Sequence, residues 1–336
     1  MADGPTLREV GEHPFLRALR ERIRARAGRT TNPAAQLLVA PGDDCAVLAA
    51  SDANLAVTTD ALVEGVHFQR AWLAAGEIGR RAIAVNLSDL AAMGATPAWT
   101  LVAVTTPPEL PAQFLDELLD GCASASEQAG ASMIGGNLTS AAMLSVTVTA
   151  AGALRDRYLT RGGAEIGDAL VVSGTLGGAA AAVAAWSAGG EPSAALRTRF
   201  AAPEARVGAG VALARAGAHA AIDVSDGLLA DLGHLCAASG VGAIVERALL
   251  PRLAEVAALD EHGGDFAATG GEDYELLFAC PPALRARLDE LARESGVPLT
   301  VIGHCVAAAD GIVLRDAGGA RHHVRATGFD HFADHA

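Results

Sequence analysis

The sequence predicts an α/β (α+β) protein of two domains. Its 336 residues exceed the usual length of a single domain. Segments with the composition of strands alternate along the chain with segments of helical periodicity, which is typical of mixed α/β architecture. Between residues 158 and 167 the composition changes to arginine and glycine. We therefore expect domains at residues 1–155 and 156–336.

In the first half of the chain, residues 7–27 carry apolar side chains at helical spacing and predict a basic amphipathic helix that covers the body of the protein. A polar, proline-bounded loop follows at residues 28–41. Beyond it we expect, in order, a strand at 55–59, a helix at 77–93, a strand at 98–105, a helix at 111–129, a short apolar segment at 132–134 and a strand at 143–154.

The second half continues the alternation. We expect a strand at 168–173, helices at 177–188 and 203–217, a strand at 220–224 that enters a helix near Gly227, a strand at 275–280, a helix at 283–295 and strands near 299–303 and 311–315. The Ala-rich helix at 177–188 is too short to span a membrane.

Composition excludes several classes of partner and mechanism. The net charge of −14 provides no basic field for nucleic acid or for an anionic membrane. Five scattered cysteines without CxxC spacing predict neither a disulfide framework nor a zinc cluster, and they fit a reducing cytoplasm. All 25 basic residues are arginine, so the chain lacks the lysine of a P-loop, of protein kinases and of Schiff-base enzymes. Any phosphate chemistry must therefore use metal ions, arginine and backbone N–H groups.

Residues 221–229 combine an apolar run with two carboxylates and a hydroxyl, those of Asp223, Asp226 and Ser225. If a strand ends here and a helix begins near Gly227, these side chains lie where α/β folds bind ligands and where helix N-termini offer N–H groups to anions. Two carboxylates beside a phosphate require a divalent cation between them. The alternative is that Ser225 or Asp226 only caps the helix.

Acidic residues recur at four other places, namely Asp43-Asp44, Thr58-Thr59-Asp60, Asp89 and Glu272-Asp273. Most of them adjoin a glycine or end an extended run, which predicts turns. Asp89 lies instead in an apolar helix, where a carboxylate is costly to bury without a partner. Mg²⁺ prefers hard oxygen ligands together with substrate phosphates, so we expect several Mg²⁺ ions at these positions. The spacings fit neither an EF-hand nor a zinc protease.

Six motifs follow one another along the chain, and they are Gly42-Asp43-Asp44, Thr58-Thr59-Asp60, Glu64-Gly65-Val66-His67-Phe68, Val85-Asn86-Leu87-Ser88-Asp89, Ile222-Asp223-Val224-Ser225-Asp226-Gly227-Leu228 and Gly270-Gly271-Glu272-Asp273-Tyr274. Their order resembles that of thiamine-monophosphate kinases, which belong to the aminoimidazole-ribonucleotide-synthetase-like ATP-binding superfamily. The resemblance covers about residues 7–332. The combination of motifs is specific, whereas no single motif is.

The resemblance implies a two-domain fold of that superfamily, with an N-terminal domain that binds ATP and Mg²⁺ and forms a homodimer through its sheet. A C-terminal domain would complete the active-site cleft between the two. The implied reaction transfers the γ-phosphoryl group of ATP to thiamine monophosphate and yields thiamine diphosphate and ADP. The transfer would be direct and in-line, without a covalent nucleophile, since phosphoryl transfer depends mainly on positioning and charge neutralisation.

The functional residues that the resemblance implies fall into three groups. The Mg²⁺ ligands are Asp44, Thr58, Thr59, Asp60, Asp89, Asn137, Asp223 and Asp226. The ATP contacts are Gly136, Asn137, Arg161 and Ser225. The thiamine-phosphate contacts are His67, Glu272 and Phe329. Two of these have structural alternatives, because His67 could simply pack in its loop and Phe329 could anchor the C-terminal segment.

Two positions depart from the family pattern. Asn137 stands where many relatives have aspartate, so it offers an oxygen ligand without charge. Leu119 stands where some relatives have a tyrosine that stacks on adenine, so adenine packing there must be apolar. These departures keep open a catalytically silent nucleotide- or thiamine-binding protein. A synthetase of the aminoimidazole-ribonucleotide type is the other alternative.

Overall fold

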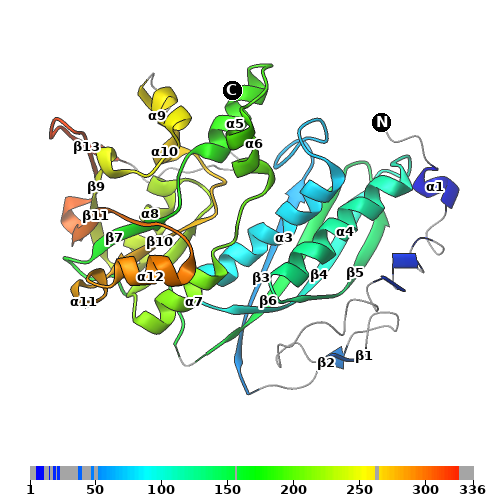
Figure 1. Cartoon of the computed structure of the whole chain (residues 1–336), viewed down its shortest axis with the longest axis horizontal. Coiled ribbons are helices and arrows are strands. Elements are labelled where there is room, and N and C mark those ends of the chain that lie inside the picture. Colours follow the sequence, from blue (N-terminus) through cyan, green and yellow to red (C-terminus); the bar gives the residue numbers. More distant parts are fainter. Residues whose placement is uncertain are drawn as a thin grey trace. The chain divides into compact units, whose positions relative to one another are not determined.

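The computed structural model describes residues 5–10, 15, 18, 19, 21, 22, 37–39, 47, 48, 52–155, 157–261 and 265–324. The chain divides into two compact units (Figure 1). The first unit is Met1–Leu90 with Ala95–Arg155, and the second is Ala91–Gly94 with Asp156–Ala336. Two predicted site residues, Asp44 and Phe329, lie outside the described residues, as does most of the segment at 7–27.

Three short elements are described near the N-terminus. Helix α1 is Leu7–Val10, and strand β1 (Leu37–Val39) pairs antiparallel with β2 (Val47–Leu48). The expectation of a loop throughout residues 28–41 is therefore wrong at β1, where three consecutive apolar residues find a partner strand.

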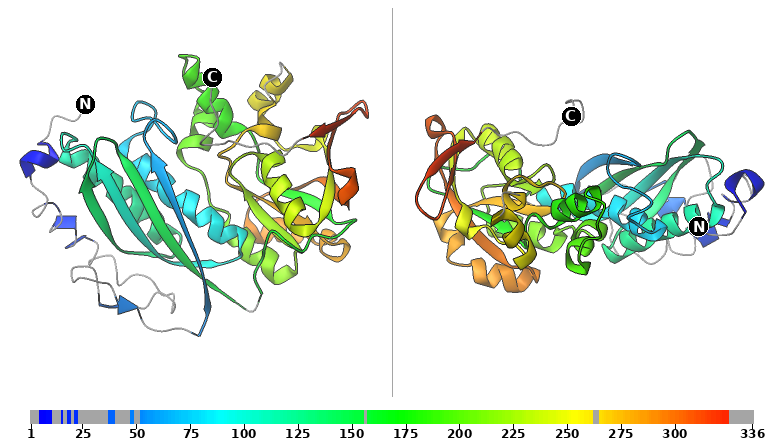
Figure 2. Two further views of the ribbon diagram at one scale, coloured as in Figure 1. Left: turned by 180° about the vertical axis from the view of Figure 1, so that it is seen from behind. Right: turned by 90° about the horizontal axis from the view of Figure 1, so that it is seen from above.

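The first unit is built on a four-stranded sheet with the order β3-β6-β4-β5. Its strands are β3 (Asn54–Val63), β4 (Thr96–Thr106), β5 (Ser132–Ser140) and β6 (Ser145–Leu154). Only β4 and β5 are parallel to each other. Helices α3 (Ala75–Ala92) and α4 (Ala112–Gln128) cover one face, and the view from behind shows the other face of the sheet (Figure 2).

Alternation along the strands decides which side chains meet the helices. In β6, the side chains of Val146 and Val148 are fully buried, whereas the intervening Thr147 is only partly buried. The two helices approach each other closely because glycine lies at their contact. A Cβ atom on Gly79 of α3 would lie 2.0 Å from the carbonyl oxygen of Leu118 on α4, so no larger residue fits there.

The second unit contains a seven-stranded sheet with the order β13-β12-β9-β11-β7-β10-β8. Its strands are β7 (Ala169–Ser173), β8 (Ala220–Val224), β9 (Val241–Glu246), β10 (Glu275–Cys280), β11 (Leu299–Ala307), β12 (Ile312–Arg315) and β13 (Arg321–Val324). Every residue of β7, β8 and β10 is buried, and apart from Ser173, Asp223 and Glu275 these residues are apolar, as is typical of strands covered on both faces.

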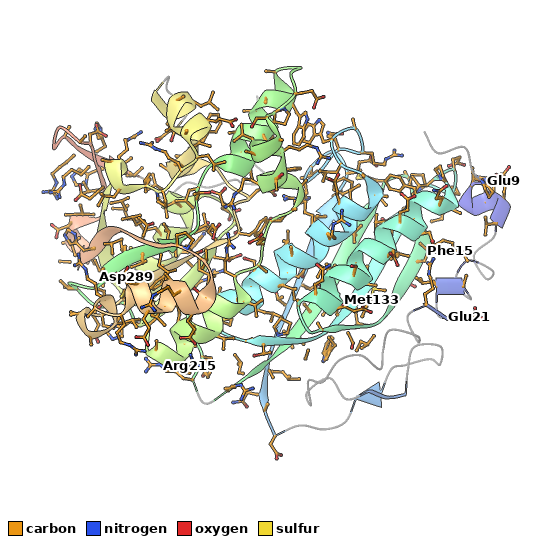
Figure 3. All side chains as sticks on the ribbon, viewed as in Figure 1. Glu9, Phe15, Glu21, Met133, Arg215 and Asp289 are labelled. Atoms are coloured by element: carbon orange, nitrogen blue, oxygen red, sulfur yellow. The ribbon has the colours of Figure 1, made fainter. Side chains whose placement is uncertain are left out.

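The helices of this unit are α5 (Gly178–Ser187), α6 (Ala194–Ala201), α7 (Val207–Ala216), α8 (Leu228–Ser239), α9 (Ala254–Glu261), α10 (Phe266–Thr269), α11 (Pro282–Arg285) and α12 (Leu288–Ser295), with short 3₁₀ turns at Arg247–Leu249 and Ala308–Asp310. Helices α7 and α12, marked by Arg215 and Asp289 in Figure 3, pack on the sheet with Phe278 of β10. Arg215 also forms an ion pair with Glu294 of α12.

The main elements lie close to their predicted positions, and four expectations need correction. Strand β3 continues to Val63, so Thr58, Thr59 and Asp60 lie within a strand and not at its end. Gly136 and Asn137 lie within β5, because this segment pairs with β4 over its whole length. The helix expected at 203–217 begins only at Val207, and the helix expected at 283–295 is divided into α11 and α12. No described helix is long and apolar enough to cross a lipid bilayer.

Candidate active site

The turn between β8 and α8 carries Ser225 and Asp226. Gly227 occupies the N-cap position of α8 with φ at 115°, a conformation that glycine adopts readily. A Cβ atom there would also lie 2.5 Å from the carbonyl oxygen of Thr269, so the position has no room for a side chain. Because the N-cap residue has no side chain, the alternative in which Ser225 or Asp226 only caps the helix is wrong.

Asp231, the fourth residue of α8, is the partner of this turn. Its Oδ2 atom accepts hydrogen bonds from the backbone N–H groups of Ser225 and Asp226, each at 3.0 Å. These two amides are therefore bonded within the protein. Burial, together with the charges of Asp223 and Asp226, raises the pKa of Asp231 to about 7. One ligand atom each from Asp226, Asp231 and His234 lie within 4.8 Å of one another.

The segment from Gly270 to Tyr274 packs directly against the same turn. The N–H of Glu272 donates to the carbonyl oxygen of Ser225 at 2.7 Å. The N–H of Tyr274 donates to the carbonyl oxygen of Val224 at 2.8 Å. Glu272 and Tyr274 have positive φ angles of 72° and 52°. Such strained conformations in residues other than glycine are maintained by the surrounding structure and are common at ligand sites. The structure thus brings the backbone of Glu272 beside that of Ser225.

The neighbouring acidic residues of this segment have structural partners. Asp273 is 4% exposed and accepts a hydrogen bond from the N–H of Gly177, at the beginning of α5, at 2.7 Å. Burial raises the pKa of Asp273 to about 7. Glu275 is 1% exposed and accepts hydrogen bonds from Arg199, Arg206 and Ser173. Burial alone would raise the pKa of Glu275, but the hydrogen bond and charge of Arg206 lower it, with help from the other two partners.

A second acidic cluster lies in the first unit, between β3 and α3. The hydroxyl of Thr58 donates to Oδ2 of Asp89 at 2.5 Å, so Asp89 has a partner that sequence proximity did not indicate. The N–H of Asp60 donates to Oδ1 of the fully buried Asn86 at 2.9 Å. Partial burial of its carboxyl group raises the pKa of Asp60, and the charge and hydrogen bond of Asp89 raise it further. Two carboxylates this close favour a cation between them.

Thr59 does not join this cluster through its side chain. Strand alternation directs it to the opposite face from Thr58 and Asp60. Its hydroxyl donates to the carbonyl oxygen of Val148 at 3.0 Å and accepts a hydrogen bond from Thr149 at 3.2 Å.

The remaining predicted residues lie at separate places. In β5, a Cβ atom on Gly136 would lie 1.8 Å from the carbonyl oxygen of Val102, and the amide of Asn137 donates to Thr139 at 2.9 Å. Nδ1 of His67 accepts the N–H of Val63 at 3.1 Å, so the neutral ring carries its proton on Nε2. Arg161 is exposed in the second unit. Leu119 is 5% exposed and belongs to the core under α4.

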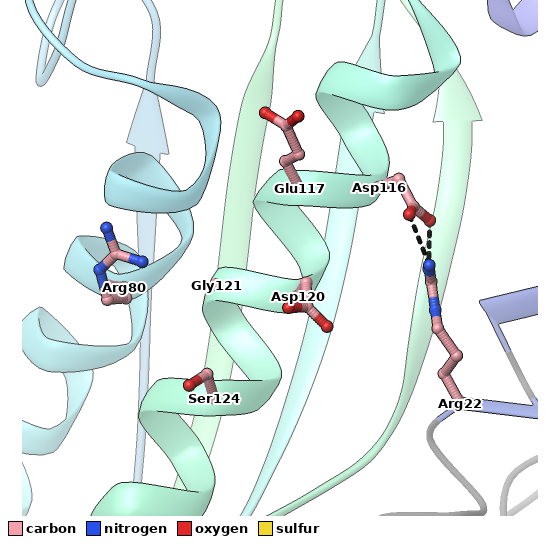
Figure 4. A pocket seen from close by; sticks show the side chains of 7 residues that line it. All are labelled: Arg22, Arg80, Asp116, Glu117, Asp120, Gly121 and Ser124. Carbon is pink, nitrogen blue, oxygen red and sulfur yellow. Dashed lines mark hydrogen bonds and ion pairs between the residues drawn. The ribbon is translucent and has the colours of Figure 1, made fainter.

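A pocket of about 400 Å³ lies on the outer side of α3 and α4 (Figure 4). It is lined by Arg22, Arg80, Asp116, Glu117, Asp120, Gly121 and Ser124. Arg22 closes one side through an ion pair with Asp116. None of the predicted site residues lines it, so we assign it no role in the chemistry.

Two family models match the chain. The model described as AIR synthase related protein, N-terminal domain, matches residues 42–154, and the corresponding C-terminal domain matches residues 165–315. A thiamine-monophosphate kinase of Mycobacterium tuberculosis is 40% identical over 284 residues, which are 83% of this chain and 83% of the relative. The chain belongs to the thiamine-monophosphate kinase family. The predicted resemblance is confirmed.

Solved structures of thiamine-monophosphate kinases share this fold. The crystal structure from Stenotrophomonas maltophilia K279a has a TM-score of 0.80 and 40% identity, and the match covers 90% of this chain and 97% of that chain. AaThiL, solved in complex with AMPPCP and TMP, has a TM-score of 0.74 and 29% identity, over 98% of this chain and all of that chain. The predicted two-domain mixed α/β fold is confirmed.

Proposed function

We propose that this protein transfers the γ-phosphoryl group of ATP to the phosphate of thiamine monophosphate, giving thiamine diphosphate and ADP. The observation that carries the proposal is the match over 98% of the chain to AaThiL, whose structure contains AMPPCP and TMP. The acidic residues of the family pattern also form local clusters, around Asp89 in the first unit and Asp226 in the second. A carboxylate cluster suits Mg-nucleotide chemistry and has no evident use in a protein that binds no cation.

The described acidic residues fit Mg²⁺ chemically, because they offer carboxylate and hydroxyl oxygens. The first unit would supply Thr58, Thr59, Asp60, Asp89 and Asn137, with Asp44, and the second would supply Asp223 and Asp226. Thr59 would take part through its backbone, since its side chain is directed to the opposite face of the sheet. Bound Mg²⁺ neutralises phosphate charge and orients the triphosphate.

The chain's own residues would bind and orient the two substrates. Gly136, Asn137, Arg161 and Ser225 would contact ATP. His67, held with its proton on Nε2, would donate a hydrogen bond to the phosphate of thiamine monophosphate, together with Glu272 and Phe329 as further contacts. No covalent nucleophile is required for direct transfer.

The proposal is tested by incubating the purified protein with ATP, Mg²⁺ and thiamine monophosphate and separating the products by chromatography. We expect thiamine diphosphate and ADP in equal amounts, and no product in the presence of EDTA. ATP binding without thiamine diphosphate would favour a silent binding protein. Turnover with formylglycinamidine ribonucleotide in place of thiamine monophosphate would favour the synthetase alternative.

We also propose a homodimer formed through the sheet of the first unit. Leu55 and Val57 are 46% and 60% exposed on the face of β3 that points away from α3 and α4, and no described helix covers this face. Light scattering should give twice the chain mass, and Val57→Glu should give the mass of one chain. A wild-type monomer at micromolar concentration would contradict this.

The four described cysteines are free and buried, which supports a reducing, cytoplasmic location.

A further inference from the structure

Asp231 belongs to none of the six family motifs, but it accepts hydrogen bonds from two residues of one of them, Ser225 and Asp226. It is 2% exposed and sits in the first turn of α8, with its own N–H bonded to the carbonyl oxygen of Gly227. Its carboxylate reaches back over the N-terminus of the helix to the amides of Ser225 and Asp226, both at 3.0 Å. Both turn amides are thus bonded within the protein.

This arrangement determines what the turn can bind. Two adjacent N–H groups near a helix N-terminus would ordinarily attract a phosphate. Here an internal carboxylate already accepts both of them, so at Ser225 and Asp226 a ligand meets the side chains, a hydroxyl and a carboxylate, and not these two amides. Those side chains bind cations directly and phosphates only through a cation or a single hydroxyl. Asp231 therefore gives the turn a preference for a metal-bound nucleotide.

The same peptide unit is held from its other side. The carbonyl oxygen of Ser225, which shares a peptide unit with the N–H of Asp226, accepts the N–H of Glu272 at 2.7 Å, so this unit is bonded to Asp231 at one side and to Glu272 at the other. Glu272 has a positive φ of 72°, which an isolated chain would not keep. Movement of the Ser225 peptide would consequently displace the residue proposed to bind the second substrate.

We propose that Asp231 is a positioning residue, which fixes the turn at Ser225–Asp226 and, through Ser225, the backbone of Glu272. The proposal rests on the kinase function proposed above. It does not require Asp231 to touch Mg²⁺ or substrate. The two amides require an acceptor oxygen at one position, so we expect the position of this oxygen to affect activity more than the charge of the side chain does.

Three substitutions separate shape from charge. Asp231→Asn keeps the shape and one acceptor oxygen but removes the charge, Asp231→Glu keeps the charge but displaces the carboxylate by one methylene, and Asp231→Ala removes both. Asp168→Ala is the matched control. Asp168 is also 2% exposed and accepts a backbone N–H, from Glu165 at 2.8 Å, but it precedes β7 at the opposite end of the sheet from Ser225.

The measurements are kcat, the KM values of ATP and thiamine monophosphate, the Mg²⁺ concentration for half-maximal rate, and Tm. We expect Asp231→Ala and Asp231→Glu to lose about 100-fold in kcat and to need about tenfold more Mg²⁺, whereas Asp231→Asn stays within about tenfold of wild type. Asp168→Ala should lower Tm and leave the kinetic constants unchanged.

Two results would overturn the proposal. The first is an Asp231→Asn variant as defective as Asp231→Glu or more so, which would indicate a charged metal ligand. The second is a set of Asp231 variants that lower Tm as Asp168→Ala does but keep wild-type kinetics. If Asp231→Ala does not fold, the proposal is still tested by whether Asp231→Asn or Asp231→Glu has the larger kinetic defect. If the wild-type protein makes no thiamine diphosphate, the proposed function fails. In that case the defects of Asp231→Asn and Asp231→Glu are compared through their Mg²⁺-dependent binding of AMPPCP, measured by calorimetry.

Discussion

Gly271 separates the two loops of the candidate site in the second unit, and replacing it by alanine should push them apart. A Cβ atom at this position would lie 2.6 Å from the carbonyl oxygen of Ser225, whereas ordinary van der Waals contact begins at 3.4 Å. The obstructing atom belongs to the backbone, so it cannot turn aside as a flexible side chain would. The loops must therefore move apart by about 0.8 Å.

The consequence can be worked out from the neighbouring hydrogen bond. The N–H of Glu272 lies 2.7 Å from the same carbonyl oxygen. A separation of about 0.8 Å lengthens this distance to about 3.5 Å, beyond a good hydrogen bond. We expect Gly271→Ala to lose about 1 kcal/mol of unfolding free energy from this bond. We expect a larger effect on activity, a decrease of about 10- to 100-fold in kcat/KM for thiamine monophosphate, because Glu272 is displaced.

The assay is steady-state thiamine diphosphate formation, with urea unfolding of the same samples. Gly208→Ala is the matched control, because Gly208 lies exposed in α7 and an added Cβ would meet nothing within 4 Å. That variant should keep wild-type kinetics and be slightly more stable, since alanine favours the helix. Wild-type kcat/KM in Gly271→Ala would refute the idea that contact between the two loops positions Glu272.

Two further predictions concern buried charges near the site. Burial raises the pKa of Asp273 to about 7, whereas the carboxyl group of an unfolded aspartate has a pKa of about 4. Between these pH values the folded protein retains a proton that the unfolded chain has lost. The free energy of unfolding therefore falls, by on the order of 4 kcal/mol, as the pH rises from about 4 to 7. Urea unfolding at pH 5 and pH 8 should show a smaller difference for Asp273→Asn than for wild type; an unchanged difference would contradict the assignment. Glu275→Gln should lower the unfolding free energy by about 3–5 kcal/mol, because Arg199 and Arg206 lose their buried anion. Glu109→Gln, at an exposed ion pair with Arg8, should change it little, and an equal loss in both would show that burial is not the cause.

Much of the second unit's site could be predicted because its signals are local in sequence. The apolar run before Asp223 and the glycine after Asp226 indicated a strand that enters a helix, and β8 accordingly ends at Val224 and α8 begins at Leu228. Strand β10 at Glu275–Cys280 has the predicted bounds, since a continuous apolar segment between two turns is typical of a buried strand.

The role of Asp231 could not be predicted in the same way. An aspartate in the first turn of a helix is common and usually interacts only with the helix dipole. Its bonds to residues five and six positions earlier depend on the angle at which the chain enters α8, which Gly227 sets through its φ of 115°. A carboxylate placed five residues after Asp226, among the apolar residues that begin the helix, was the available signal.

Thr59 and Glu275 illustrate two other limits of the sequence. Thr58-Thr59-Asp60 read as the end of a strand, but β3 continues to Val63, and alternation then separates Thr59 from its neighbours. Glu275 is neutralised by arginines about 70 residues earlier in the chain, one of them on α6, a helix that the sequence did not indicate. Pairings of that range depend on the tertiary fold and leave no local pattern.

Direct phosphoryl transfer is tested by a single-turnover reaction with ATP labelled at the γ-phosphate. Excess enzyme, Mg²⁺ and thiamine monophosphate are mixed with the labelled ATP, and protein, inorganic phosphate and thiamine diphosphate are separated over time. We expect the label to pass into thiamine diphosphate at the rate at which ADP appears, with none on the protein. Label that appears only in inorganic phosphate, or that remains in ATP while thiamine monophosphate is unchanged, would contradict it.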